Sequence, residues 1–156
     1  MDISSRLEFA APPAEVYAML TDQAYLEQVC VASHSLSYEA SVDGNRTHTS
    51  RTLSAPESTA RFTGATLTVN DDTTWGPAQP DGSRTADVRL TVQGQPVTLK
   101  AEMRLTPGGK GSEILLAGEL KVAIPLLGKK IEQSAAPAVL AGFRTQQQVG
   151  DAWLSR

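Results

Sequence analysis

The chain has 156 residues, of which 40% are hydrophobic and 20% charged, with a net charge of −3 and a single cysteine. This length predicts one domain over residues 1–156, and the composition excludes a disordered chain, which would have fewer apolar residues and less balanced charge. The acidic balance argues against a nucleic-acid partner, and the lone Cys30 excludes an intrachain disulfide framework.

The sequence shows no secretion or membrane-spanning signal. The N-terminus has no basic segment followed by an apolar stretch, and no run of about 18 apolar residues occurs anywhere. We therefore expect a cytoplasmic protein without stable membrane insertion. Lys129 and Lys130 could meet an anionic membrane surface, but the overall negative charge favours a simple solvated face.

The first part of the chain predicts one strand followed by two short helices. Apolar and polar residues alternate over residues 3–9, as in a half-buried strand. Pro13 suits the first turn of a helix, which we predict over residues 14–20. Thr21 and Asp22 can cap a second short helix that reaches about residue 31.

From residue 35 the hydrophobic period changes to two and predicts six more strands. The turn Asp43-Gly44-Asn45 joins strands over 36–42 and 46–53, and a further strand runs from residue 65 to near Asp71-Asp72. Three regular strands follow over 86–92, 97–105 and 114–122. Such one-sided alternation indicates an antiparallel sheet with one face in the core and one in water.

Apolar and small residues at spacings of three and four predict a long C-terminal helix over residues 127–153. Pro137 lies inside this helix and predicts a kink near Ala135-Ala136. The expected fold is α+β, with a curved seven-stranded antiparallel sheet gripping the C-terminal helix. Because Ala135, Ala138 and Gly142 give the helix a narrow inner face, side chains need not fill the space below it.

A few segments are more specific than the alternating strands. The run Ile-Pro-Leu-Leu-Gly-Lys-Lys-Ile-Glu at residues 124–132 is the most distinctive, together with segments 51–53 and 62–67, Trp75 and Gly118. Over nearly its whole length the chain resembles the START-like superfamily, also called SRPBCC or helix-grip, and within it a bacterial family of unknown function. The resemblance implies a fold whose members bind lipids, sterols or polyketides in a cavity, and some of which catalyse cyclisation or dehydration there.

We therefore expect a cavity between the sheet and the C-terminal helix that binds a small hydrophobic or amphipathic, lipid-like ligand. The inward-facing positions predict its lining as Leu67, Val69, Val88, Leu90, Leu99, Met103, Leu116, Leu120, Leu140 and Phe143. Trp75 follows a strand and either borders the mouth of the cavity or packs in the core.

Arg51 is the one candidate for a charged ligand contact. If the turn before it is a two-residue loop, Arg51 shares the inner face with Tyr38, whereas a three-residue loop would turn His48 inward instead. An inward Arg51 could anchor a ligand carboxylate or phosphate through its planar guanidinium. The alternatives are an internal pair with Glu132 or a position at an open rim.

Other chemistry has weaker support in the sequence. Cys30 and His34 stand four residues apart but lack a third catalytic partner, so we expect Cys30 to be a buried structural residue. With only two histidines and no clustered carboxylates we predict no metal site, and we expect no cofactor.

Two alternatives to ligand binding stay open. One is a cyclase- or dehydratase-type enzyme using Arg51, His48 or Tyr38, and the other is a cavity-free module that docks a partner protein.

Overall fold

The computed structural model describes residues 1–156 and has seven strands and four helices. In chain order the elements are β1 (Asp2–Phe9), α1 (Pro13–Leu20), α2 (Gln23–Ala32), β2 (Ser37–Asp43), β3 (Arg46–Ser54), α3 (Glu57–Thr63), β4 (Thr66–Trp75), β5 (Arg84–Val92), β6 (Val97–Gly108), β7 (Gly111–Val122) and α4 (Gly128–Leu154).

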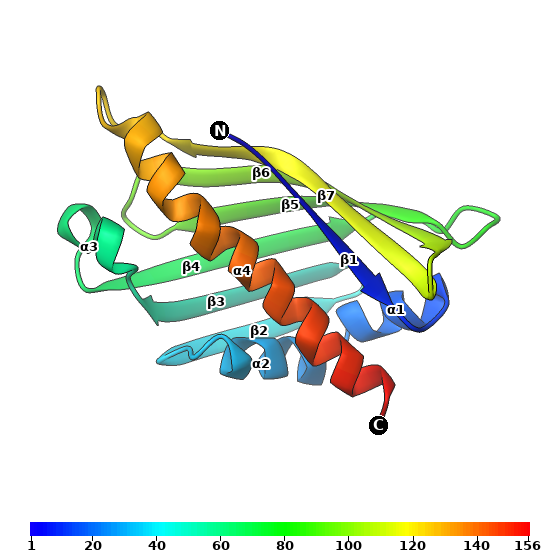
Figure 1. The fold of residues 1–156 in the computed structure, drawn as a ribbon. Coiled ribbons are helices and arrows are strands. Elements are labelled where there is room, and N and C mark those ends of the chain that lie inside the picture. Colours follow the sequence, from blue (N-terminus) through cyan, green and yellow to red (C-terminus); the bar gives the residue numbers. More distant parts are fainter.

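All seven strands form one antiparallel sheet in the order β1-β7-β6-β5-β4-β3-β2. The chain meanders from β2 to β7, and β1 then adds beside β7. The sheet curves around α4, which lies diagonally across its inner face (Figure 1). The predicted α+β fold with a sheet gripping the C-terminal helix is therefore confirmed.

Local signals account for the ends of the first two helices. Pro13 occupies the first position of α1, where its missing N–H costs no helical hydrogen bond. The Asp22 side chain caps α2 by accepting a hydrogen bond of 2.8 Å from the Ala24 N–H. Helix α2 lies against β2 and α4, whereas α1 contacts β6 and β7 (Figure 1).

Two details differ from the sequence prediction. The segment predicted only as a break after β3 contains the short helix α3, and β4 continues through Trp75 instead of ending near Asp71-Asp72.

Helix α4 continues through Pro137 as one uninterrupted helix. It is 27 residues long, but no helix of the protein combines the length and apolar character needed to cross a membrane.

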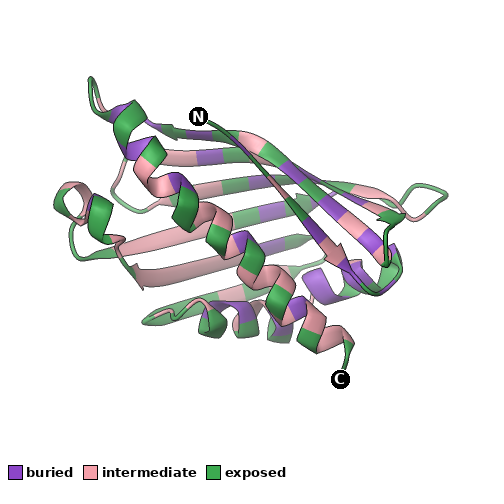
Figure 2. Ribbon diagram, in the orientation of Figure 1, coloured by how far each residue is buried: buried purple, intermediate pink, exposed green.

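The densest part of the core lies where β1, β7, β6 and α1 meet the C-terminal half of α4. Phe9, Val16 and Leu105 are fully buried there, and buried residues are concentrated at this end (Figure 2). Glu8 and α4 are tied by a hydrogen bond of 3.1 Å from the Glu8 N–H to Gln147 Oε1. Strands β3 and β4, by contrast, present mostly half-buried residues to the interior.

Both tryptophans belong to this packing. Trp75 is 2% exposed and meets the ring of Tyr17 edge-on at 5.7 Å, so it is a core residue. Trp153, near the end of α4, meets Tyr25 of α2 edge-on at 5.9 Å. The end of α4 is therefore fastened to a neighbouring helix through Trp153.

Candidate functional site

A cavity of about 510 Å³ lies between the sheet and the middle of α4. This volume is in the range of cavities that hold drug-sized molecules. Its walls are mainly apolar side chains from β3 to β7 on one side and α4 on the other, and residues of α3 lie at one end. The main apolar residues of the wall are Leu53, Leu67, Val69, Leu90, Val92, Val97, Leu99, Leu120, Val122, Ile131 and Val139.

Small residues of α4 leave this space open. Ala135, Ala138 and Gly142 line the cavity, and a Cβ atom added at Gly142 would meet no heavy atom within 4 Å. Because the helix presents no large side chain at these positions, it cannot fill the concave face of the sheet. The hollow is thus a consequence of residue size on one helix face.

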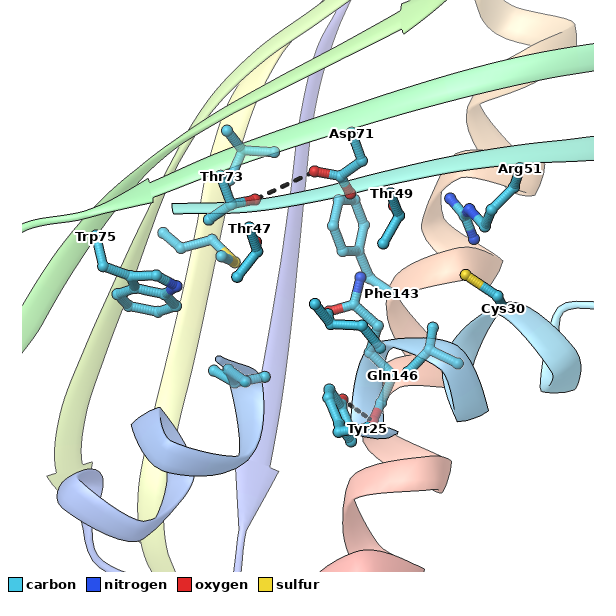
Figure 3. Close-up of a pocket in the computed structure, with 15 residues that line it drawn as sticks. Tyr25, Cys30, Thr47, Thr49, Arg51, Asp71, Thr73, Trp75, Phe143 and Gln146 are labelled. Carbon is cyan, nitrogen blue, oxygen red and sulfur yellow. Dashed lines mark hydrogen bonds between the residues drawn. The ribbon is translucent and has the colours of Figure 1, made fainter. Parts of the chain in front are cut away.

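A second, smaller cavity of about 50 Å³ continues toward α1 and α2. Its lining is more polar, with Thr47 and Thr49 from β3 and Thr73 from β4. Tyr25 lies on its floor and donates a hydrogen bond of 2.8 Å to the carbonyl of Gln146 (Figure 3). Burial raises the pKa of the Tyr25 hydroxyl, so Tyr25 stays a neutral donor.

Four residues line both cavities: Arg51, Asp71, Phe143 and Gln146. They mark the place where the two spaces meet. Arg51 and Asp71 are the only Asp, Glu, Lys or Arg residues in the lining of either cavity. The site therefore combines a large apolar chamber, a small chamber with a more polar lining, and one charged cluster between them.

The turn before β3 determines which side chain of that strand faces the interior. Asp43 pairs with Arg46, so Gly44 and Asn45 form a two-residue loop, and Arg51 stands opposite Tyr38. This is the register that predicts an inward Arg51, and Arg51 does line the interior. His48 points the other way, and on the outer face its Nδ1 lies 2.7 Å from Oδ1 of Asp72.

One of the alternatives for Arg51, an internal pair with Glu132, does not occur. Glu132 accepts hydrogen bonds from the Val122 N–H at 3.0 Å and from the Met1 amino group at 3.1 Å. Arg51 instead donates through Nη1 to the Ser33 hydroxyl at 3.3 Å, and its buried Nε has no acceptor. The sequence could not show this, because Glu132 is occupied by groups that are distant from it along the chain.

Sequence reasoning missed Asp71 as an interior residue. It stands in the middle of β4 with its side chain in the cavity lining, and its Oδ1 accepts a hydrogen bond of 3.1 Å from the Thr73 hydroxyl (Figure 3). Burial raises the pKa of Asp71, although Arg51 and the Thr73 hydroxyl act in the opposite direction. The signal that could have found it is parity, because residues 67, 69, 71, 73 and 75 share one face of an unbroken strand.

The predicted lining residues divide between the two cavities and the core. The large cavity is lined by Leu67, Val69, Leu90, Leu99 and Leu120, and the small one by Trp75, Val88 and Met103. Arg51 and Phe143 line both. Leu116 and Leu140 line neither: Leu116 is a core residue with 3% exposure, and Leu140 packs against the core from outside the cavities.

The remaining candidates lie at the edge of this site or outside it. Cys30 is buried, as expected, and borders the small cavity, where burial raises the pKa of its thiol. Tyr38 is 40% exposed and lines neither cavity. No group of three or more His, Cys, Asp or Glu side chains is placed to hold a metal ion.

Several solved structures share this fold at low sequence identity. TTHA0849 from Thermus thermophilus has a TM-score of 0.65 and 16% identity, over 97% of this chain and 98% of its own. The di-domain ARO/CYC StfQ from the steffimycin biosynthetic pathway has a TM-score of 0.66 and 13% identity, over 97% of this chain and 50% of its own. Ara h 8.0201 has a TM-score of 0.58 and 16% identity, over 100% of this chain and 99% of its own.

These likenesses show the fold, which is the START-like helix-grip (SRPBCC) fold expected from the sequence. No curated protein matches the sequence itself. A family model does match, and it covers residues 4–154, almost the entire chain. The chain therefore belongs to the family described as "Protein of unknown function (DUF2505)".

Proposed function

We propose that this protein binds one small amphipathic molecule in the cavity between the sheet and α4. The observation that supports this most directly is the cavity of about 510 Å³ with apolar walls and a single charged cluster at one end. Binding sites for small molecules commonly combine apolar walls with a few placed polar groups. The apolar part of the ligand would fill the large chamber, and its polar end would meet Arg51, Asp71 and Gln146.

The apolar walls supply the affinity in this proposal. Each methylene group moved from water into the cavity contributes about 0.8 kcal/mol, so a chain or ring system of ordinary lipid size would bind without any ion pair. The unfilled interior argues against the alternative of a cavity-free docking module.

The experiment is native mass spectrometry of the purified protein, followed by denaturing extraction and identification of any released small molecule. We expect a mass excess that survives gentle ionisation and disappears on denaturation. If the protein is isolated empty, titration with the neutral dye Nile red provides the same test, with an expected stoichiometry of one dye per chain. Absence of both a bound molecule and dye binding would contradict the proposal.

A pair of variants locates the binding site. Leu67→Arg places a long cation in the large cavity, whereas Leu115→Arg places it on the opposite face of the sheet, where Leu115 is 50% exposed. We expect Leu67→Arg to abolish binding and Leu115→Arg to leave it unchanged. A folded Leu67→Arg variant that binds with unchanged affinity would place the ligand elsewhere.

A second candidate function is cyclase-type catalysis in the same cavity, the chemistry that the name of StfQ indicates for that protein. The observation that favours it is Asp71, a titratable group with a raised pKa inside the cavity, because general acid–base catalysis needs such a group within reach of the substrate. Incubating the protein with the extracted molecule separates the two functions. A product of changed mass or retention time that is lost in Asp71→Asn indicates catalysis, and unchanged ligand indicates binding alone.

A further inference from the structure

The charged cluster consists of one cation and one anion that face the same space. Arg51 of β3 and Asp71 of β4 both line the junction of the two cavities, and no other Asp, Glu, Lys or Arg residue lines either one. Their opposite formal charges cancel. The interior therefore has no net charge to offer a ligand when both groups are ionised.

The sheet register keeps the two side chains from forming a direct ion pair. Arg51 stands opposite Val69 and Asp71 stands opposite Thr49, so the two residues are diagonal neighbours on one face, with Cα atoms about 7–8 Å apart. No nitrogen of Arg51 lies within 4.0 Å of an oxygen of Asp71. The guanidinium donates instead to the hydroxyl of Ser33, the residue that follows α2.

Both side chains keep unused hydrogen-bonding capacity. Arg51 donates only through Nη1: its Nε is buried without an acceptor, whereas its Nη2 is accessible and has no acceptor in the protein. Asp71 Oδ1 accepts from the Thr73 hydroxyl, and Oδ2 has no donor in the protein. A ligand group between Arg51 Nη2 and Asp71 Oδ2 would pair both atoms if it could accept a hydrogen bond from the first and donate one to the second.

We propose that the polar end of the ligand is an uncharged group that both accepts and donates, with a hydroxyl as the simplest case, accepting from Arg51 and donating to Asp71. This inference rests on the proposed function and replaces the earlier expectation of a carboxylate or phosphate anchored by Arg51. A hydroxyl has one donor and two acceptor sites, which matches the groups left unpaired here.

Charge balance decides against an anionic ligand group. A ligand carboxylate would gain from Arg51 but would lie close to the Asp71 carboxylate, and it would lose its hydration on entering an apolar chamber. A cationic group has the corresponding conflict with Arg51. Because burial raises the pKa of Asp71 even with Arg51 nearby, Arg51 does not compensate fully for one buried anion, and a second would be less favourable still.

The test compares decan-1-ol with decanoate, two ligands of equal chain length, by displacement of Nile red at pH 7.5. Any apolar cavity prefers the alcohol, so the diagnostic quantity is how Asp71→Asn changes the ratio of the two dissociation constants. Asn is nearly isosteric with Asp and keeps an acceptor for the Thr73 hydroxyl. We expect Asp71→Asn to tighten decanoate binding roughly tenfold or more, because a like charge at this distance is removed, and to leave decan-1-ol binding equal or weaker.

Asp72→Asn is the matched control, since Asp72 is the next residue of β4 and lies on the outer face beside His48. We expect it to change neither ligand. If Asp71→Asn leaves the ratio unchanged, or if the wild-type protein binds decanoate more tightly than decan-1-ol, the inference is wrong while the proposed function stands. If neither ligand nor Nile red binds the wild-type protein, the proposed function fails and the inference fails with it.

Discussion

The two ends of the sheet interior share one sheet and helix α4 but differ in how they are filled. Where β1, β6 and β7 meet α1 and the C-terminal half of α4, large side chains such as Phe9 and Leu105 are fully buried. Where β3 and β4 face the middle of α4, the interior holds about 510 Å³ of space. We call these regions the filled half and the hollow half; buried residues gather in the first, and half-buried residues predominate on β3 and β4 in the second (Figure 2).

Two glycines of α4 illustrate the difference. A Cβ atom added at Gly150 would overlap the ring of Phe9 and lie 3.0 Å from Met19 Cε, whereas one added at Gly142 would meet nothing within 4 Å. At Gly150 the neighbouring side chains leave no room for a larger residue. At Gly142 there is room for a side chain, and none is present. The filled half thus has the packing of a structural core, and the hollow half has the surplus space of a binding site.

The largest expected contrast comes from truncating one side chain in each half. Phe9→Ala should lower the free energy of unfolding by about 3–5 kcal/mol, because Phe9 is fully buried in dense packing. Leu67→Ala should cost less than about 2 kcal/mol, because part of the Leu67 side chain already faces the cavity. Chemical denaturation of both variants measures the two values.

Leu115→Ala on the outer face is the control, and its effect should stay within about 0.5 kcal/mol. Equal losses for Phe9→Ala and Leu67→Ala would show that the two halves are packed alike, and the distinction between them would be wrong.

Adding one methyl group to each glycine sharpens the comparison. Gly150→Ala should lower the free energy of unfolding by about 1–3 kcal/mol, because the new Cβ must displace the buried Phe9 ring. Gly142→Ala should raise it by about 0.5–1 kcal/mol, because alanine is the better helix former and the methyl group meets open space. Thermal denaturation of the two variants gives opposite shifts if this is right, and shifts of the same sign would contradict it.

The sequence predicts orientation well because alternation and turn length are local properties. The two-residue loop at Gly44-Asn45 was enough to turn Arg51 inward and His48 outward. The C-terminal helix was equally predictable from its spacing, and α4 ends within one residue of the expected position.

The features that escaped prediction depend on tertiary structure. Alternation shows that Leu116 and Leu120 both face inward, yet only Leu120 borders a cavity, since packing volume is decided by residues on other elements. Asp71 is untypical of a strand interior, and Arg51 and Thr73, which partly offset the cost of burying it, come from two strands. Helix α3 has seven residues, too few for a periodic pattern to be recognised.

The smallest effects on stability are expected from two carboxylates, Glu132 and Asp71. Like the two halves, one is fully occupied by neighbouring groups and the other is not. Glu132 has both oxygens occupied by donors, and its hydrogen bond from the Val122 N–H is the main reason that its pKa is lowered. Asp71 has one oxygen that no protein group occupies, and burial raises its pKa. The two groups should therefore contribute to stability with opposite dependence on pH.

The sign of each contribution follows from which state of the protein binds the proton more tightly. The folded protein holds the Glu132 proton more weakly than the unfolded chain, so Glu132 stabilises the fold above its ordinary pKa of 4.5, and this stabilisation is lost as the pH falls through the lowered value. The folded protein holds the Asp71 proton more tightly, so stability falls as the pH rises from the ordinary pKa of 3.8 through the raised value.

Denaturant unfolding of wild type, Glu132→Gln and Asp71→Asn between pH 3 and 7 tests both signs. Glu132→Gln should lose less stability than wild type on acidification, and Asp71→Asn should gain most relative to wild type at neutral pH. If Asp71→Asn followed the wild-type curve at every pH, the Asp71 carboxylate would be well solvated. The hollow half would then hold no buried, unpaired acceptor for a ligand.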